Sequence, residues 1–216
     1  MKTLRRWIGG IKRRLSGLLE VKAGIMLSQP VLPESSVASG QGLTEPELRH
    51  IVRYRADLAC SEPEFERRTR RGNRLYELSA EGQWLCYGWV AEAGTRIGVL
   101  HNLQLTVPER AFYIWDCATD PAVRGRGYFR TLLKEIVNAH YPVSTLALVA
   151  VDTGNHASRK ALANAGFRPV FTYYSVRFLG FVPFSFALKD GKITAAQPQF
   201  DGLRHGKAVV RGSVHS

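Results

Sequence analysis

The stretch from residue 112 to residue 167 constrains the fold of this 216-residue chain more than any other. Residues 112–119 are rich in aromatic and β-branched side chains, which favour a buried strand. Residues 128–137 then carry apolar side chains at helical spacing, and residues 146–151 are apolar throughout, as in a strand covered on both faces. The pattern predicts strand, turn, helix and strand, followed by a short helix over 157–165 that Asn155 caps and Gly166 ends.

The turn between this first strand and its helix carries two glycines, Gly125 and Gly127, flanked by Arg124 and Arg126. A helix N-terminus presents unpaired backbone N–H groups and the positive end of the helix dipole, so it attracts anions. The glycines lack the Cβ atoms that would keep a phosphate away from the backbone, and the arginines add charge-assisted donors. The turn therefore predicts an anion site at the start of the helix.

With Asn155 and Ser158 after the next strand and Gly166 before Phe167, the region resembles the GNAT superfamily of N-acetyltransferases over about residues 75–180. The resemblance implies an α/β (α+β) fold whose mixed, mostly antiparallel central sheet is splayed and flanked by helices. It implies acetyl-CoA, or another acyl-CoA, as cosubstrate and no metal. The implied reaction is direct acyl transfer to the amine of a small acceptor, such as an amino sugar or amino acid, without an acyl-enzyme.

The same resemblance assigns roles to main-chain groups on the first strand and in the turn. Cys117, Ala118 and Thr119 would hold pantetheine and polarise the thioester carbonyl, backbone amides of 124–129 would bind the pyrophosphate, and two residues near the last helix would contact the pantetheine arm. The expected cofactor-binding set is Cys117, Ala118, Thr119, Arg124, Gly125, Arg126, Gly127, Tyr128, Phe129, Asn155 and Ser158.

Two positions depart from the family pattern. Phe129 stands where the turn usually ends in Gly or Ala, and we expect its side chain to point away from the phosphates. Leu162 stands where many members place a tyrosine that acts as general acid, and leucine cannot donate a proton. We predict Asp116 as the general base, with a structural hydrogen bond as the alternative role, and Tyr173 or Tyr174 as a replacement acid.

The net charge of +12 is concentrated in residues 2–14 and 67–74, and it does not follow a surface with interleaved aromatic residues. That distribution argues against a specific nucleic-acid partner. The three cysteines, Cys60, Cys86 and Cys117, have no metal-binding spacing, which favours a reducing cytoplasm. Cys117 has no histidine nearby in sequence, so we expect a buried thiol.

We expect three parts: a basic amphipathic extension over 1–20, an acyltransferase domain over 21–190 and a loosely ordered tail over 191–216. The extension, with Trp7 on its apolar stripe, predicts either peripheral contact of residues 1–19 with an anionic inner membrane face or packing on the domain or a partner subunit. The alternative function is a non-catalytic GNAT-like binding module tethered by this extension. The oligomeric state stays open, with a homodimer as one option.

Further elements follow from turn and capping signals. Thr44 and Glu47, like Ser61 and Glu64, form capping-box patterns, which predict helices over 45–59 and 62–71. The aromatic residues Trp84, Tyr87 and Trp89 would either line an acceptor pocket or pack in the core. The remaining expected strands cover 21–27, 75–79 and 83–92 as a hairpin, 97–105, 170–178 and 181–188.

Overall fold

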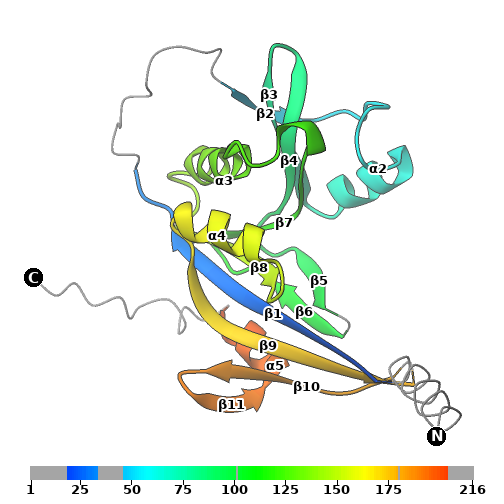
Figure 1. Ribbon diagram of the computed structural model, residues 1–216, viewed down its shortest axis with the longest axis vertical. Coiled ribbons are helices and arrows are strands. Elements are labelled where there is room, and N and C mark those ends of the chain that lie inside the picture. Colours follow the sequence, from blue (N-terminus) through cyan, green and yellow to red (C-terminus); the bar gives the residue numbers. More distant parts are fainter. Residues whose placement is uncertain (1–18, 34–45, 101, 180, 204–216) are drawn as a thin grey trace, which may run out of the picture.

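The computed structural model describes residues 19–33, 46–100, 102–179 and 181–203 of the chain. Its centre is a nine-stranded sheet in the order β11-β10-β9-β1-β8-β7-β4-β3-β2 (Figure 1). The strands are β1 (Leu19–Pro30), β2 (Glu47–Ile51), β3 (Asn73–Ala80), β4 (Gln83–Ala91), β7 (Ala111–Thr119), β8 (Leu146–Asp152), β9 (Arg168–Phe178), β10 (Phe181–Lys189) and β11 (Lys192–Ala195). Within the described part of the chain, β7 and β8 are the one pair of strands that runs in parallel. The predicted mixed, mostly antiparallel sheet is confirmed.

Helices cover both faces of this sheet. The described helices are α2 (Glu62–Arg70), the 3₁₀ turn η1 (Pro121–Val123), α3 (Tyr128–Ala139), α4 (His156–Asn164) and α5 (Ala196–Leu203). The first face packs against α3 and α4, and the second face packs against α2, α5 and a separate hairpin of β5 (Arg96–Leu100) and β6 (Leu103–Thr106). The helices α3 and α5 turn an apolar stripe toward the sheet, whereas α2 and α4 are each anchored by one buried apolar residue, Phe65 and Leu162.

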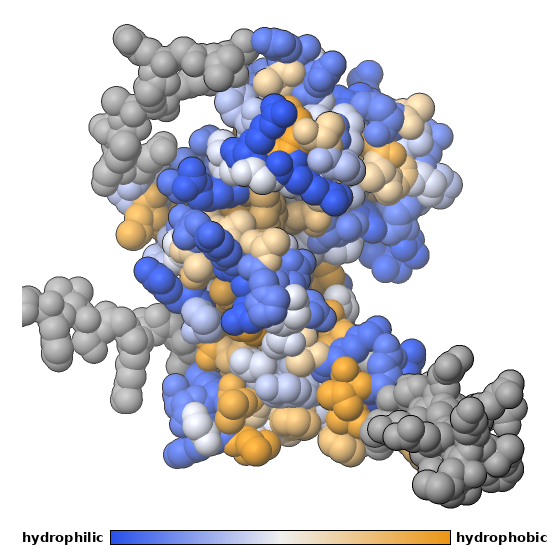
Figure 2. All heavy atoms as spheres, viewed as in Figure 1, coloured by the Kyte–Doolittle hydropathy of each residue, from blue (hydrophilic) through white to orange (hydrophobic). Residues whose placement is uncertain are grey.

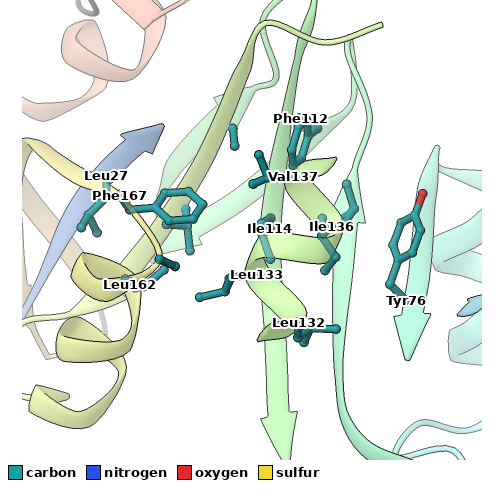
Figure 3. Packing of buried hydrophobic residues seen from close by; sticks show 14 of the residues in the cluster. Leu27, Tyr76, Phe112, Ile114, Leu132, Leu133, Ile136, Val137, Leu162 and Phe167 are labelled. Atoms are coloured by element: carbon teal, nitrogen blue, oxygen red, sulfur yellow. The ribbon is translucent and has the colours of Figure 1, made fainter. Parts of the chain in front are cut away.

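The core of the first face fixes α3 and α4 against the parallel strands. Leu132, Leu133, Ile136 and Val137 of α3 are buried at helical spacing. Figure 3 shows them with Phe112 and Ile114 of β7, while Leu162 and Phe167 lie on the α4 side of the same cluster. The glycine turn before α3 is thereby anchored on one side and α4 on the other.

The first strand lies in the middle of the sheet, between β8 and β9 and antiparallel to both. Gly24 pairs with Asp152 on one side and with Tyr173 on the other. A Cβ atom at Gly24 would lie 2.3 Å from the Tyr173 ring, so the buried tyrosine requires glycine at this point. The predicted strand over 21–27 is confirmed and extends to both sides.

Two sequence predictions between residues 45 and 105 are wrong. The described part of 45–59 holds no helix: residues 47–51 form β2, an edge strand paired with β3, and turns follow. Its pairing and the stacking of His50 on Tyr76, with ring centres 5.3 Å apart, outweigh the capping pattern. The single strand over 97–105 is instead the β5–β6 hairpin, which stands apart from the main sheet.

The predicted loose tail is also wrong as far as the structure describes it. After β11, residues 196–203 form α5, and Ala196, Phe200 and Leu203 are fully buried on the second face. The Phe200 ring meets those of Phe171 and Tyr173 at 5.1 Å between ring centres. Residues 204–216, and residues 1–18 of the predicted extension, lie outside the described residues, while Leu19 and Glu20 already belong to β1.

The other predicted elements are confirmed with small shifts of their bounds. The helix expected over 62–71 is α2, although the Ser61 side chain makes no capping hydrogen bond. The hairpin of β3 and β4, the strand β7, the helix α3 and the strand β8 all stand where the periodicity places them. Asn155 caps α4, Gly166 follows it with a φ of +102°, and β9 and β10 form the last long hairpin.

Candidate active site

The parallel strands β7 and β8 part halfway along their length. Their pairing runs from Ala111 opposite Leu146 to Ile114 opposite Val149 and then stops. Beyond that point β7 stays paired with β4 as far as Thr119, and β8 stays paired with β1 as far as Asp152. The facing edges of the two strands therefore carry main-chain donors and acceptors that no longer bond across the sheet, and this gap is called the β7–β8 split below.

A β-bulge in β7 lies at the split. Asp116 and Cys117 together oppose the single residue Gly88, because Trp115 pairs with Trp89 and Ala118 pairs with Tyr87. Asp116 has a φ of +45°, in the left-handed region that aspartate tolerates better than most residues. A Cβ at Gly88 would lie 2.9 Å from the Cys117 sulfur, so glycine makes room for the bulge. The bulge changes the direction of the main chain at the predicted thioester site.

The glycine turn that follows β7 opens α3. Gly125 and Gly127 have φ values of +79° and +88°, and Gly127 is the N-cap residue of the helix. A Cβ atom built on either glycine meets no atom within 4 Å, so the space above both residues is open. Within the described chain, the amides of residues 124–127 donate to no other backbone group. The turn thus combines free N–H groups, a helix N-terminus and open space.

The side chains of the turn leave that space clear. Arg124 folds back and donates from Nε to the carbonyl oxygen of Thr119 at 3.2 Å, which ties the turn to the end of β7. Tyr128 and Phe129 both pack against the core of the first face. The expectation that Phe129 points away from the anion site is therefore met by its packing. Asp120 accepts from the Ala122 amide at 2.8 Å and fixes the start of the turn.

Across the split, α4 begins with Asn155, whose Oδ1 accepts from the backbone amide of Ser158 at 3.0 Å. This side-chain cap satisfies one of the first amides of the helix and places both predicted pantetheine contacts at its N-terminus. Leu162, one turn further on, is 1% exposed and packs in the core with Leu27 and Phe167. Its side chain is held by apolar neighbours (Figure 3).

On the second face, Asp116 meets α2 through Arg68. The guanidinium of Arg68 lies over the rings of Trp89 and Trp115, 5.0 and 4.5 Å from their centres. It donates to Asp116 Oδ2 at 2.5 Å and to Glu64 Oε1 at 2.7 Å. Burial alone lowers the pKa of Arg68, but the bonds to these two carboxylates outweigh burial and raise it.

A small hollow of about 20 Å³ lies beside Asp116, lined by residues that include Cys60, Tyr87 and Trp89. Burial raises the pKa of the Cys60 thiol and of the Tyr87 hydroxyl, so both stay protonated near neutral pH. Among the residues that line the hollow, Asp116 supplies the carboxylate. Of the aromatic residues weighed for an acceptor pocket, Tyr87 and Trp89 line the hollow, while Trp89 also belongs to a buried cluster with Phe65.

The structure brings the predicted cofactor residues together around the split, but it separates the two predicted catalytic residues. Asp116 is on β7 at the α2 side, whereas Tyr173 is on β9, 3% exposed and packed beneath α5. Burial raises the pKa of Tyr173, so its hydroxyl stays protonated. Cys117, which we expected to be a buried thiol, is partly buried, and burial raises the pKa of its thiol as well.

Sequence reasoning missed the position of Arg68. The sequence places four arginines, Arg67, Arg68, Arg70 and Arg71, in and just after α2, and they could face either an acidic acceptor or solvent. In the structure Arg68 packs under the sheet, with its side chain 17% exposed, whereas the other three are exposed. A signal exists: Glu64 precedes Arg68 by four residues, and tryptophans stand at paired positions on two strands. Among the described residues, no three His, Cys, Asp or Glu side chains form a metal site.

Comparisons with known proteins bear on this arrangement. Residues 52–167 match the sequence model of the Acetyltransferase (GNAT) family. A GCN5-related N-acetyltransferase from Sphaerobacter thermophilus superposes with a TM-score of 0.51 at 12% identity, over 79% of this chain and 56% of that one. A tandem GNAT protein from the clavulanic acid biosynthesis pathway gives 0.50 at 17% identity, over 80% and 59%. No curated protein matched by sequence.

The chain spans less than two thirds of the length of these solved structures. At such identities the superpositions establish the fold, a splayed sheet flanked by helices. The family match covers more than half of the sequence, and it includes the bulged strand, the glycine turn and the capped helix. By its sequence and its fold, the chain belongs to the GNAT family of acetyltransferases.

Proposed function

We propose that the chain transfers an acetyl group from acetyl-CoA to the primary amine of a small acceptor, such as an amino sugar or an amino acid. The observation that carries the proposal is the β7–β8 split, together with a glycine turn at the N-terminus of α3 where a Cβ on either glycine would meet only open space. An acetyltransferase of this family needs both features, one for the pantetheine arm and one for the diphosphate. The donor supplies an acyl group already activated as a thioester.

The residues around the split fit such a donor. The amides of 124–129 lie at the N-terminus of α3, where the helix dipole favours negative charge. The unpaired edge of β7 at Cys117, Ala118 and Thr119 offers main-chain groups that an extended amide chain can pair with, as an added strand would. Asn155 and Ser158 at the start of α4 close the other side.

The acceptor amine is proposed to enter on the α2 side, at the hollow beside Asp116. This carboxylate accepts the proton that the attacking amine loses, while its bond to Arg68 fixes its orientation. Arg68 is here a positioning residue, because it acts through Asp116. We expect Asp116→Asn to lower kcat strongly with little change in KM for acetyl-CoA. If Asp116 is the base, the pH–rate profile of this variant should also lose its acidic limb, whereas a purely structural role would leave that limb in place.

Tyr173 is proposed to donate the proton to the leaving thiolate, in place of the tyrosine that Leu162 replaces. Its phenol is protonated and its ring is locked by Phe171 and Phe200. Tyr173→Phe removes only the hydroxyl, so the packing survives and the effect on kcat can be read directly. A variant with wild-type kcat would remove Tyr173 from the mechanism.

The first experiment is calorimetric binding of coenzyme A to the full chain. Gly127→Glu places a carboxylate in the open space above the turn, and we expect affinity to fall at least about a hundredfold through charge repulsion and steric exclusion. Gly94→Glu is the matched control, since Gly94 also has a positive φ, +81°, and no atom within 4 Å of its Cβ position. Wild-type affinity in Gly127→Glu would end the assignment.

The second experiment measures release of the coenzyme A thiol from acetyl-CoA with a panel of amines. Turnover with at least one amine, lost in Gly127→Glu and kept in Gly94→Glu, supports the acetyltransferase. Binding of coenzyme A without turnover across the panel would favour the alternative, a non-catalytic module. The two experiments therefore separate failure of the binding site from failure of the chemistry.

A further inference from the structure

Five large apolar side chains are exposed at the end of the β9–β10 hairpin and on the neighbouring start of β1. Phe181 is 78% exposed, Val21 57%, Leu179 and Phe184 56%, and Phe178 48%. We call these five residues the hairpin-end patch. Figure 2 shows hydrophobic residues along the lower end of the molecule, where β9, β10 and β11 lie in Figure 1.

The strand register makes the patch continuous. Val21 of β1 and Phe184 of β10 both pair with Val176 of β9, from its two sides, so the three side chains share one face of the sheet. Phe181 pairs with Phe178 at the end of the same strands. Side chains that are adjacent on one face form a single apolar surface, and such surfaces on soluble domains mark contact sites.

Among the described residues, no helix covers this surface. On the first face, α4 reaches β1 and β9 near Ile25 and Pro169, far from the hairpin end along both strands. On the second face, α5 packs against Phe171 and Tyr173, again away from the end. The hairpin-end patch therefore projects beyond the helices that cover the rest of these strands (Figure 1).

The chain itself indicates the chemistry of the partner. Leu19, the first residue of β1, pairs with Phe178, so residues 1–18 join the domain at the patch. These eighteen residues contain no Asp or Glu, and their six cations are Lys2, Arg5, Arg6, Lys12, Arg13 and Arg14. Leu4, Trp7, Ile8, Ile11 and Leu15 repeat at helical spacing in the same segment. A partner at this end must offer both apolar volume and negative charge.

We propose that the hairpin-end patch and residues 1–18 dock together on an anionic lipid bilayer. The apolar side chains enter the boundary between headgroups and acyl chains, and the cations meet the anionic headgroups. Two weak anchors side by side give the stable attachment that either alone would not. A second copy of this chain suits the site less well, because each copy brings a net charge of +12. Among the described residues, no helix is long and apolar enough to cross a bilayer.

The test is sedimentation of the full chain with vesicles of phosphatidylcholine alone or with about 30 mol% phosphatidylglycerol. We expect binding only to the anionic vesicles, weakened by salt. Phe181→Asp should lower the partition coefficient about tenfold, because it puts a charge where an apolar ring enters the lipid. Val143→Asp is the matched control, since Val143 is 79% exposed and lies outside the patch, and it should bind as wild type does.

Arg5→Glu combined with Arg6→Glu tests the second anchor and should reduce both binding and its dependence on salt. Thermal unfolding of each variant should match wild type, because every changed side chain is exposed or lies outside the described core. Equal binding to neutral vesicles, or wild-type binding by Phe181→Asp, would overturn the proposal. The proposal would also be wrong if the chain did not bind vesicles but formed a dimer that Phe181→Asp dissociates. A second copy of the chain would then be the occupant of the hairpin-end patch.

The membrane-docking proposal would likewise be wrong if the chain did not bind vesicles, stayed monomeric and had residues 1–18 protected from proteolysis. In that case the segment covers the patch within the same molecule. None of these readouts depends on acetyl transfer, so failure here leaves the proposed function untouched.

Discussion

The two sides of the β7–β8 split both pack apolar residues in the core, but they differ in the contacts added to that core. The side of β7, β4, β3 and β2 adds ion pairs at partly buried positions, such as Arg68 with Asp116 and Arg55 with Glu77 at 2.6 Å. The side of β8, β1, β9, β10 and β11 adds close aromatic packing, with Tyr173 against Phe200 and over glycine at position 24. We call the first side the polar half and the second the apolar half.

The apolar half should be the less tolerant of added volume. Gly24→Ala puts a methyl group 2.3 Å from the ring of Tyr173, which cannot move aside because it is 3% exposed. We expect a loss of about 3 kcal/mol in the free energy of unfolding, measured by urea denaturation. Gly98→Ala is the control, since its Cβ would meet nothing within 4 Å, and it should change stability by less than about 0.5 kcal/mol.

The stability of the polar half should depend more on Arg68 than on its other arginines. Arg68→Ala removes two carboxylate bonds and the contact with Trp89 and Trp115, and we expect a cost of about 2 kcal/mol. Arg67→Ala, whose side chain is 58% exposed and pairs with Glu64, should cost less than about 0.5 kcal/mol. Equal effects of the two substitutions in chemical denaturation would show that the buried position carries no extra stability.

Leu162→Tyr probes whether the apolar core around α4 can accept the tyrosine that many members of the family have at this position. Leu162 is 1% exposed, so the larger ring should destabilise the fold by about 1.5 kcal/mol, whereas Leu162→Met should cost less. If another group donates the proton, turnover per folded enzyme should not rise. A large gain in kcat for Leu162→Tyr would instead show that proton donation limits this chain.

The smallest expected effect concerns acid stability in the polar half. The approach of His140, whose Nε2 lies 3.5 Å from Glu92 Oε1, is the main cause that lowers the pKa of Glu92, with burial opposing it and Arg74 adding to it. A carboxylate whose folded pKa is lowered stabilises the fold above its ordinary pKa, and this contribution is lost as the pH falls through the folded value. Stability of wild type should therefore drop on acidification below about pH 4.5, and Glu92→Gln should flatten that drop. An unchanged profile in the variant would remove Glu92 as the cause.

The fold was predictable where a local pattern and the tertiary contacts agree. The hairpin β3–β4, the strand β7 and the helix α3 follow directly from periodicity, because their apolar residues face the core that they predict. The segment 47–51 shows the opposite case. Its capping pattern favours a helix, but the open edge of β3 offers a strand partner, and no local signal reports that edge.

The features of the candidate site also fall into those that a local sequence pattern predicts and those that it does not. Main-chain features such as the glycine turn and the Asn155 cap could be predicted, because only certain residues permit them. Contacts between distant side chains could not, since Arg68 and Asp116 are brought together by α2 packing across β4. The helix α5 carried a readable signal in the spacing of Ala196, Phe200 and Leu203, which proline and glycine nearby obscured.

The central place of β1 has a consequence for synthesis. Its partners lie far along the sequence, since Gly24 pairs with Asp152 on β8 and with Tyr173 on β9. Such long-range pairing slows folding, and until β8 and β9 have emerged from the ribosome the strand exposes two unsatisfied edges to other nascent chains. The middle of the sheet can therefore close only after β9 has been synthesised.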